Sequence, residues 1–430
     1  MKRTRNSRAR AVALGLLALS LGSAPAWPAH AAAPPELASW KLNLTGATGY
    51  GGLPANVQQV RYSTGSVYIN CSSIPSYSIG PWPMNPNTPT NQNFLLRIPR
   101  TPVENTGAKT STPLGPVGSW TNGVAIFNAL DARSYNNQNI WHQNAIQVEG
   151  PSFDACLGHP APNGAYHNHE NVACLYTPYT MVHSIILGYA FDGFPVYGPY
   201  AYANTNGTGD ITRMRSSYAL RNITVRQTLP DGTVLVPSQY GPAVSATYPL
   251  GYYVEDYGYT VGSGDLDATN GRFAMTPDYP SGTYAYYVTL DAAGNGVYPY
   301  DIGSKYYGIV AAENITSHGR VTIAEPVTTY VPTVGVAPAP LGAGSLALRQ
   351  NQPNPVRAGT TISYTVPASG WVSLKLYDAR GRELLTLVDA ERNAGVNTVS
   401  LDTGRLEAGV YFYRLKAGEV TQSRRLLVVR

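Results

Sequence analysis

Short apolar runs, each broken after a few residues by turn-forming residues, dominate the chain from about residue 34 onward. Runs of Val, Thr and Tyr alternate with clusters of Gly and Pro, and the Tyr-rich runs at 251–254 and 284–288 are examples. β-Branched and aromatic residues bounded by turn residues are typical of strands. No long stretch shows the spacing of an amphipathic helix. The pattern therefore predicts a mainly β fold, with a β-rich body over residues 34–325.

A more regular alternation of apolar and polar residues marks the region from residue 346 to residue 430. The predicted strands there are 362–366, 372–377, 384–388, 398–401, 410–415 and 425–429. Turn signals separate these runs, for example at 378–381 and 393–395. Short strands at a spacing of roughly 8–12 residues are typical of a β-sandwich. We expect a C-terminal, immunoglobulin-like β-sandwich.

The two β regions are separated by residues 326–345, which are rich in Pro and carry no charge. Prolines favour an extended, semi-rigid backbone and give this segment no basis for a packed core. We therefore interpret it as a linker between the body and the C-terminal domain.

The N-terminus has the pattern of a secretory signal peptide over residues 1–33. Lys2, Arg3, Arg5, Arg8 and Arg10 precede an apolar run at 11–22, and small residues follow up to residue 33. A basic start, an apolar centre and a small-residue end are the three parts of such a leader. The apolar run is too short to span a bilayer. We expect an exported protein whose mature chain has no transmembrane segment.

Removal of the leader changes the charge argument. The formal net charge of +5 comes from 30 basic and 25 acidic residues. Five of the basic residues lie in the leader, so the mature chain is nearly neutral. A neutral chain offers no electrostatic footprint for nucleic acid, and we expect no such partner.

The three cysteines are an odd number for an exported chain. Cys156 and Cys174 enclose the segment that is richest in histidine, and we expect them to form a disulfide. Cys71 would then be free and buried, or an additional metal ligand. Thiolate ligation by the other two is the alternative, which an oxidising compartment disfavours.

Five of the seven histidines lie between residues 142 and 183. His167 and His169 are two apart, so that both rings project to the same face of an extended strand. His159 is the nearest third candidate, and Gly164 permits the chain to turn back toward it. Imidazole suits both zinc and copper. We predict a copper or zinc site on His159, His167 and His169, and ligand type alone does not distinguish the two metals.

Further ligands require the fold to bring distant residues together. The additional candidates for the metal site are His142, His183 and Asp192. Asp154 and Glu170 are other carboxylates that could act as ligands or orient an imidazole. The alternative is that these histidines are hydrogen-bonded residues of the core or the surface, satisfied by tyrosines and without any metal.

Residues 350–430 resemble the C-terminal sorting domain of type IX secretion substrates. The matching segments are 351–355, 361–364, 372–381 and 409–415. The resemblance implies recognition by the type IX secretion machinery, followed by release from the cell or attachment to its surface. The alternative is an ordinary immunoglobulin-like module without an address function.

A second resemblance covers about residues 65–200 and points to the YHYH domain family. It rests on 154–160, 164–169, 174–175, 183–184 and 188–198, with upstream matches at 74–80, 91–94 and 123–131. The family takes its name from a Tyr-His-Tyr-His run, and this chain has Tyr166-His167-Asn168-His169. Asn168 replaces the second Tyr, but on a strand it faces away from the two histidines. The resemblance names a domain and defines no activity.

Three functions fit these patterns. The first is an exported or cell-surface protein that binds copper or zinc on the histidines. The second is a metal-dependent hydrolase of a surface polymer, in which Asp192 or Glu170 would be the general base. The third is a structural or adhesive surface protein whose histidines and tyrosines only pack. Because no nucleophile elbow, zinc-protease helix or phosphate loop is present, the sequence leaves open whether the protein is an enzyme.

Overall fold

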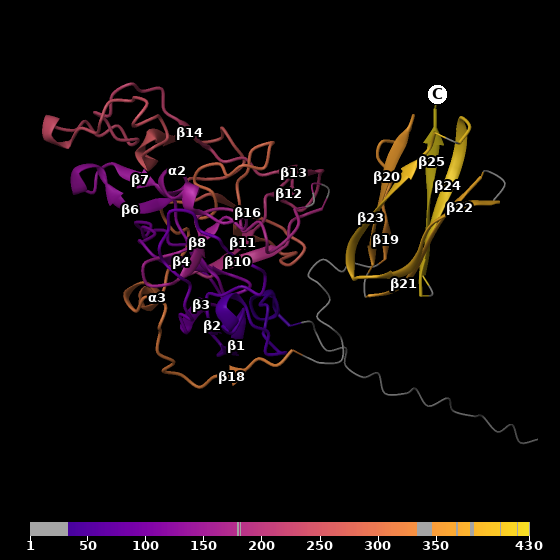
Figure 1. Ribbon diagram of the computed structural model, residues 1–430, viewed down its shortest axis with the longest axis horizontal. Helices are drawn as coiled ribbons and strands as arrows, with labels where there is room; N and C mark the ends of the chain where they lie inside the picture. The colour runs from indigo at the N-terminus through magenta and orange to yellow at the C-terminus, as the bar shows by residue number, and fades with distance from the viewer. Residues whose placement is uncertain are drawn as a thin grey trace, which may run out of the picture. The chain divides into compact units, whose positions relative to one another are not determined.

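The computed structural model describes residues 33–332 except 179 and 181, and residues 346–429 except 367, 368, 379–381, 405 and 419. Residues 1–32 of the expected signal peptide and residues 333–345 of the expected linker lie outside the described residues. The body and the C-terminal domain are each described by themselves (Figure 1). Both are built mainly from strands, as the sequence predicted.

One sheet of the body has four strands in the order β18-β1-β2-β3. Its strands are β1 (Val57–Tyr62), β2 (Ser66–Cys71), β3 (Phe94–Pro99) and β18 (Thr328–Thr329). Thr329 of β18 pairs with Arg61 of β1, and the backbone N–H of Tyr330 donates to the carbonyl of Val60 over 2.8 Å. The first residues of the expected linker therefore belong to the body.

A second, eight-stranded sheet organises the rest of the body, in the order β16-β17-β11-β10-β4-β5-β9-β8. Its strands are β4 (Pro116–Trp120), β5 (Ala125–Phe127), β8 (Gly158–Pro160), β9 (Tyr166–Asn168), β10 (Ile186–Ala190), β11 (Pro195–Tyr197), β16 (Gly271–Ala274) and β17 (Thr283–Tyr287). Because β17 pairs in parallel with β11, residues 271–287 complete a sheet that begins at residue 116. The histidine-rich strands β8 and β9 lie at its other edge.

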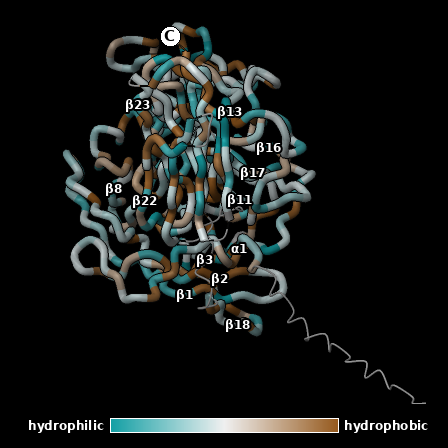
Figure 2. Tube along the Cα trace, turned by 90° about the vertical axis from the view of Figure 1, so that its right-hand side faces the viewer, coloured by the Kyte–Doolittle hydropathy of each residue, from teal (hydrophilic) through white to brown (hydrophobic). Residues whose placement is uncertain are grey.

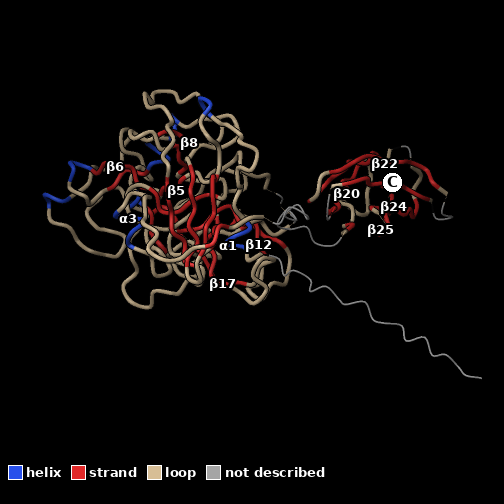
Figure 3. The backbone as a smooth tube through the Cα atoms, turned by 90° about the horizontal axis from the view of Figure 1, so that it is seen from below, coloured by secondary structure: helices blue, strands red, loops and turns tan. Residues whose placement is uncertain are grey.

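Three two-stranded sheets and short helices surround these layers (Figure 3). The sheets pair β6 (Leu130–Ser134) with β7 (His142–Asn144), β12 (Tyr200–Tyr202) with β13 (Ile211–Arg213), and β14 (Tyr218–Leu220) with β15 (Tyr257–Tyr259). The α-helices are α1 (Pro35–Ala38), α2 (Ala145–Val148) and α3 (Ala312–Thr316). The 3₁₀ turns are Tyr50–Gly52, Tyr135–Asn137, Gly150–Ser152, Pro237–Gln239 and Val254–Asp256. Among the described residues, no helix has the length and apolarity needed to cross a membrane.

The main core of the body lies between the two larger sheets, and aromatic residues fill much of it. Trp40, Trp120, Tyr166 and Tyr189 belong to one continuous buried cluster with β-branched residues of both sheets. All five residues of β10 are buried, and Figure 2 shows hydrophobic stretches around β2 and β3 of the four-stranded sheet. The Tyr-rich run at 284–288 falls on β17 and its end, as predicted, and packs in this core.

The predicted strand at 251–254 is wrong. Gly251 adopts a φ of +95°, a left-handed conformation that only glycine adopts readily. The chain turns there, Tyr253 makes a single bridge to Gln143, and a 3₁₀ turn follows from Val254 to Asp256. Tyr253 is buried among these turns, and the pattern of hydrophobic residues does not distinguish such a buried turn from a strand.

The C-terminal domain has two sheets around one core, a sandwich-like arrangement. Strands β19 (Ala347–Leu348), β20 (Gly359–Val366) and β23 (Gly395–Asp402) form one sheet. The other contains β21 (Gly370–Tyr377), β22 (Glu383–Arg392), β24 (Gly409–Ala417) and β25 (Val420–Val428). In β21 every second residue from Val372 is buried, and these side chains join Ile362 and Leu401 of the facing sheet. The six strands predicted here all fall on observed strands.

Candidate metal centre

Strands β8 and β9 bring three of the predicted histidines together. His159 lies directly opposite His167 in the antiparallel register, and residues directly opposite share one face of a sheet. His169 follows His167 by two residues and points to the same side. With Glu149 these histidines form a group, the His/Glu cluster, whose four ligand atoms all lie within 4.8 Å of one another.

The closest approaches in the His/Glu cluster are between ring nitrogens and between ring nitrogens and the carboxylate of Glu149. Nε2 of His167 lies 3.0 Å from Nε2 of His169. Oε2 of Glu149 lies 3.1 Å from Nε2 of His169 and 2.9 Å from Nε2 of His159. The contact with His159 has the distance but not the direction of a hydrogen bond, because this buried Nε2 has no hydrogen-bond partner. The four ligand atoms are thus close enough to one another to share one cation.

The tautomers of two rings follow from their other nitrogens. Nδ1 of His167 donates to the carbonyl of Ala165 over 3.0 Å, and Nδ1 of His169 donates to the carbonyl of Asn128 over 2.6 Å. A carbonyl can only accept, so in the neutral rings the proton is on Nδ1 and the lone pair is on Nε2. Backbone carbonyls that hold Nδ1 in this way orient the imidazoles of metal sites.

The charge states in the His/Glu cluster favour metal ligands. Burial lowers the pKa of His167 well below its usual value, and the neighbouring His169 and His159 lower it further. Burial raises the pKa of Glu149, but the close contacts of its carboxylate with His159 and His169 outweigh burial and hold this pKa far below the usual range. Neutral imidazole and ionised carboxylate are the forms that bind a cation.

Aromatic rings enclose the histidines and leave access on the side of Glu149. Phe127 stacks on His167 with ring centroids 3.8 Å apart, and Phe153 lies 4.9 Å from His159. The exposed fraction of the side chain is 8% for His159 and 2% for His169, but 24% for Glu149. Asp131 lies beside Glu149, and burial followed by this neighbour raises the pKa of Asp131 to about 6.

Glu149 is the cluster member that the sequence did not indicate. It follows α2, whose N-terminus is capped by Asn144: Oδ1 of Asn144 accepts from the backbone N–H of Ile146 over 3.2 Å. Nδ2 of Asn144 donates to the hydroxyl of Tyr300 over 2.8 Å. No spacing to the histidines marks Glu149, because its place depends on partners more than 100 residues away.

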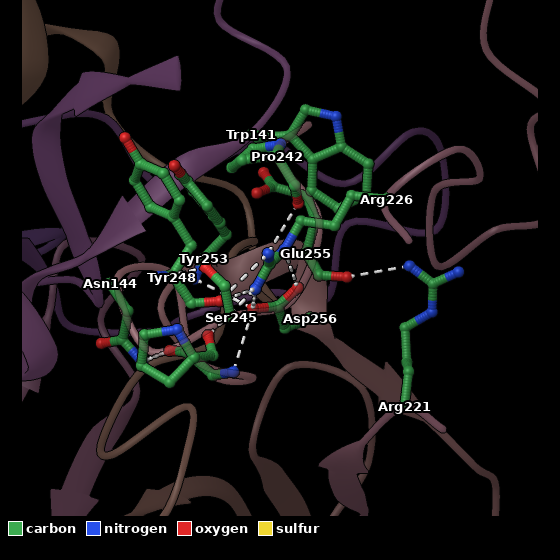
Figure 4. A network of polar contacts seen from close by, with 12 residues as sticks. Trp141, Asn144, Arg221, Arg226, Pro242, Ser245, Tyr248, Tyr253, Glu255 and Asp256 are labelled. Carbon is green, nitrogen blue, oxygen red and sulfur yellow. Dashed lines mark hydrogen bonds and ion pairs between the residues drawn. The ribbon is translucent and has the colours of Figure 1, made fainter. Parts of the chain in front are cut away.

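A buried ion pair is connected to Asn144 by hydrogen bonds through the backbone of Gly251 (Figure 4). Arg226 and Asp256 are both fully buried and joined over 2.7 Å. Oδ2 of Asp256 also accepts from the backbone N–H of Gly251, and the carbonyl of Gly251 accepts from Nδ2 of Asn144. Since a buried charge is retained only when it is paired and hydrogen-bonded, this network fixes the loop on which the cap of α2 depends.

The other three predicted ligands do not belong to the His/Glu cluster. His142 pairs through Nδ1 with Oε1 of Glu255 over 2.6 Å. His183 donates from Nδ1 to the carbonyl of Ser184 over 2.8 Å. Asp192 accepts from the hydroxyl of Tyr286 over 2.6 Å and from the N–H of Gly308 over 2.8 Å. Each of these three residues is hydrogen-bonded elsewhere in the body.

Asp154 and Asn168 stabilise the strands that carry the histidines. The carboxylate of Asp154 accepts from the hydroxyl of Tyr166 over 3.0 Å and from the N–H of Gly80 over 2.8 Å. Asn168 points away from the histidines, as expected, and donates to the carbonyl of Leu157 over 2.8 Å. Glu170 is buried, which raises its pKa to about 7, and it is not a cluster member.

The predicted disulfide between Cys156 and Cys174 is present. Cys71 is free and buried, as the sequence indicated. It lies at the end of β2 in the main core, and burial raises the pKa of its thiol to about 12. Among the described residues it is not part of a group that could hold a metal.

Comparison with known families identifies the two parts of the chain. Residues 352–429 match the secretion system C-terminal sorting domain, so the chain is one of the proteins that are secreted and attached to the cell surface. Residues 95–295 match the family described as YHYH protein, so the chain contains a YHYH region that precedes its C-terminal sorting domain. The sorting domain implies handling by the type IX secretion system. The YHYH match covers residues 95–295 and so ends later in the chain than the expected range of about residues 65–200.

Similarity to solved structures is slight. Dimeric latent PorU from Porphyromonas gingivalis is 17% identical with a TM-score of 0.18, over 24% of this chain and 10% of that chain. The Ig1 domain of mouse SynCAM 2 is 13% identical with a TM-score of 0.14, over 18% of this chain and 90% of that one. The chain thus spans about a tenth of the length of PorU. No curated protein matches it.

Proposed function

We propose that this exported protein binds one zinc or copper ion on Glu149, His159, His167 and His169. The observation that carries the proposal is the contact of the two Nε2 atoms of His167 and His169 at 3.0 Å. With both Nδ1 atoms held by carbonyls, two neutral rings would direct lone pairs at each other. A cation between them and the Glu149 carboxylate removes this repulsion.

The donor set supports a holding function. Three imidazoles and one carboxylate complete a four-coordinate shell for zinc, and such a closed shell is typical of sites that hold a metal and do not activate water. Copper also favours imidazole. The aromatic rings of Phe127 and Phe153 add an apolar surround, which limits the access of water.

The hydrolase alternative has less support. It assigned the general base to Asp192 or Glu170, and neither is a member of the His/Glu cluster. Asp192 is fully buried and already accepts hydrogen bonds from Tyr286 and Gly308. A general base must reach the proton that it abstracts. The burial and hydrogen bonds of Asp192 indicate that this residue stabilises the core.

Elemental analysis of the purified protein tests the proposal. We expect about one zinc or copper ion per chain after exposure to either metal and exhaustive dialysis, and loss of that ion in the double variant His167→Ala/His169→Ala. The control is His318→Asn, because His318 is an exposed histidine outside the cluster. Circular dichroism should show that both variants fold. Equal metal content in the double variant and the wild type would contradict the proposal, as would a wild type without bound metal.

A further inference from the structure

The disulfide encloses every histidine of the His/Glu cluster. Cys156 and Cys174 are separated by 18 positions, and His159, His167 and His169 all lie between them. We infer that the sulfur of Cys174 is a site of thiol–disulfide exchange, and that reduction of the bridge by an external thiol or dithiol weakens the cation site. The second half of this inference rests on the proposed function.

The two cysteines of the bridge differ in exposure. Cys174 is exposed, whereas Cys156 is buried with 3% of its surface accessible. Exchange requires a thiolate to approach one sulfur of the bridge, so attack is directed to Cys174. Cys71 does not compete, because it is buried and its raised pKa keeps it a thiol.

The exchange is balanced by the external reductant. A thiolate of a dithiol attacks Sγ of Cys174, forms a mixed disulfide with it, and releases Cys156 as a thiolate that takes a proton from water. The second thiolate of the dithiol then attacks the dithiol's first sulfur, which is bonded to Cys174 in the mixed disulfide. This closes the dithiol into a disulfide and releases Cys174 as a thiolate. The bridge gains two electrons, and the dithiol loses two and becomes a disulfide.

The topology explains why the cation site should loosen. Strand β8, which carries His159, is only three residues long and forms the edge of its sheet, with β9 as its one neighbour. Residues 170–174, which follow His169, contain no strand. The bridge is thus the covalent link that joins the start of β8 to the end of the segment after β9. Without it, the three imidazoles must be ordered when the ion binds, which costs affinity.

Zinc affinity measures the effect of the bridge. We would compare the wild type with Cys156→Ser/Cys174→Ser by competition with a chromophoric zinc chelator, and use Cys71→Ala as the control for loss of a cysteine elsewhere. We expect a dissociation constant about tenfold or more higher in the double variant, because the ligands are no longer preorganised. A change smaller than about twofold would overturn the inference.

A second route avoids dependence on the folding of that variant. Native wild-type protein is reduced, the two thiols released from the bridge are blocked with iodoacetamide, and its zinc content is measured after gel filtration. Loss of zinc is expected, and full retention would overturn the inference. Blocking matters because free thiolates would bind zinc themselves.

Exposure to glutathione tests the site of attack. Mass spectrometry of the native protein should locate the glutathione adduct on Cys174. An adduct confined to Cys156, or no adduct, would overturn the assignment of Cys174. If the oxidised wild type binds neither zinc nor copper, the proposed function fails, while the position of the adduct still decides where exchange occurs.

Discussion

His142 and His159 each lie within 3 Å of a glutamate oxygen, at 2.6 Å from Glu255 and 2.9 Å from Glu149, but they have different surroundings. The carboxylate of Glu255 accepts hydrogen bonds from both the ring Nδ1 and the backbone N–H of His142. The carboxylate and the imidazole are therefore hydrogen-bonded to each other. Glu149 approaches His159 and His169 together, and Nε2 of His159 has no hydrogen-bond partner. A histidine beside a carboxylate is therefore a metal candidate only when their donors and acceptors remain unmatched.

The largest difference between the His/Glu cluster and the pair of His142 and Glu255 is expected in zinc affinity, when one histidine is removed from each. His159→Ala removes one ligand of four, and we expect zinc affinity to fall about 100-fold or more, since each metal–imidazole bond contributes much of the binding energy. His142→Ala is the matched control and should leave affinity within about twofold. Competition with a chromophoric chelator measures both. Equal losses would mean that the two assemblies do not differ as described.

A smaller effect is expected at the carboxylate. Glu149→Gln keeps the size of the side chain but removes its charge, and we expect zinc affinity to fall about tenfold to 100-fold. Glu255→Gln is the corresponding change in the other assembly and should not alter it. If Glu149→Gln binds zinc as tightly as the wild type, the cation is held by the histidines alone, and the four-ligand shell is wrong.

The smallest effect is on stability and comes from the pair of His142 and Glu255. The hydrogen bond to Glu255 raises the pKa of His142, while burial raises the pKa of Glu255. A raised histidine pKa contributes stability that is complete below the unfolded value of about 6.5 and is lost as the pH rises through the folded value. We expect the wild type to lose about 0.5–1 kcal/mol between about pH 6 and pH 8 relative to Glu255→Gln, because the pair is only partly buried.

Urea unfolding of the two proteins at several pH values checks this expectation. The sign is the decisive part: the difference in unfolding free energy between wild type and Glu255→Gln should shrink as the pH rises. A difference that is constant with pH would show that His142 is not charged in this pair. The variant leaves the His/Glu cluster unchanged and serves as its own control for metal content.

The convergence of three histidines was predictable because it depends on local geometry. The spacing of His167 and His169 and the turn at Gly164 were visible in the sequence, and the register placed His159 opposite His167. His142 and Asp192 were near the histidines in sequence, but their partners are Glu255 for His142 and Tyr286 and Gly308 for Asp192. Such long-range contacts leave no local pattern.

The same contrast applies to the fold. The C-terminal strands are long and bury alternate residues, so their period of two is plain. Strands of the body, such as β8, β9 and β11, have three residues each and are buried throughout. A run that short has no period to detect, so the sequence pattern at 251–254 predicts a strand where the chain turns.

The pairing of β18 with β1 has a consequence for the order of assembly. Residues 328–329 complete a sheet whose first strand begins at Val57, so most of the body must emerge before this edge can be closed. A chain that stopped before residue 328 would leave the backbone of β1 without this partner, and an open edge invites pairing with another chain. The exposed edge of β1 is therefore covered only late in the assembly of this exported polypeptide.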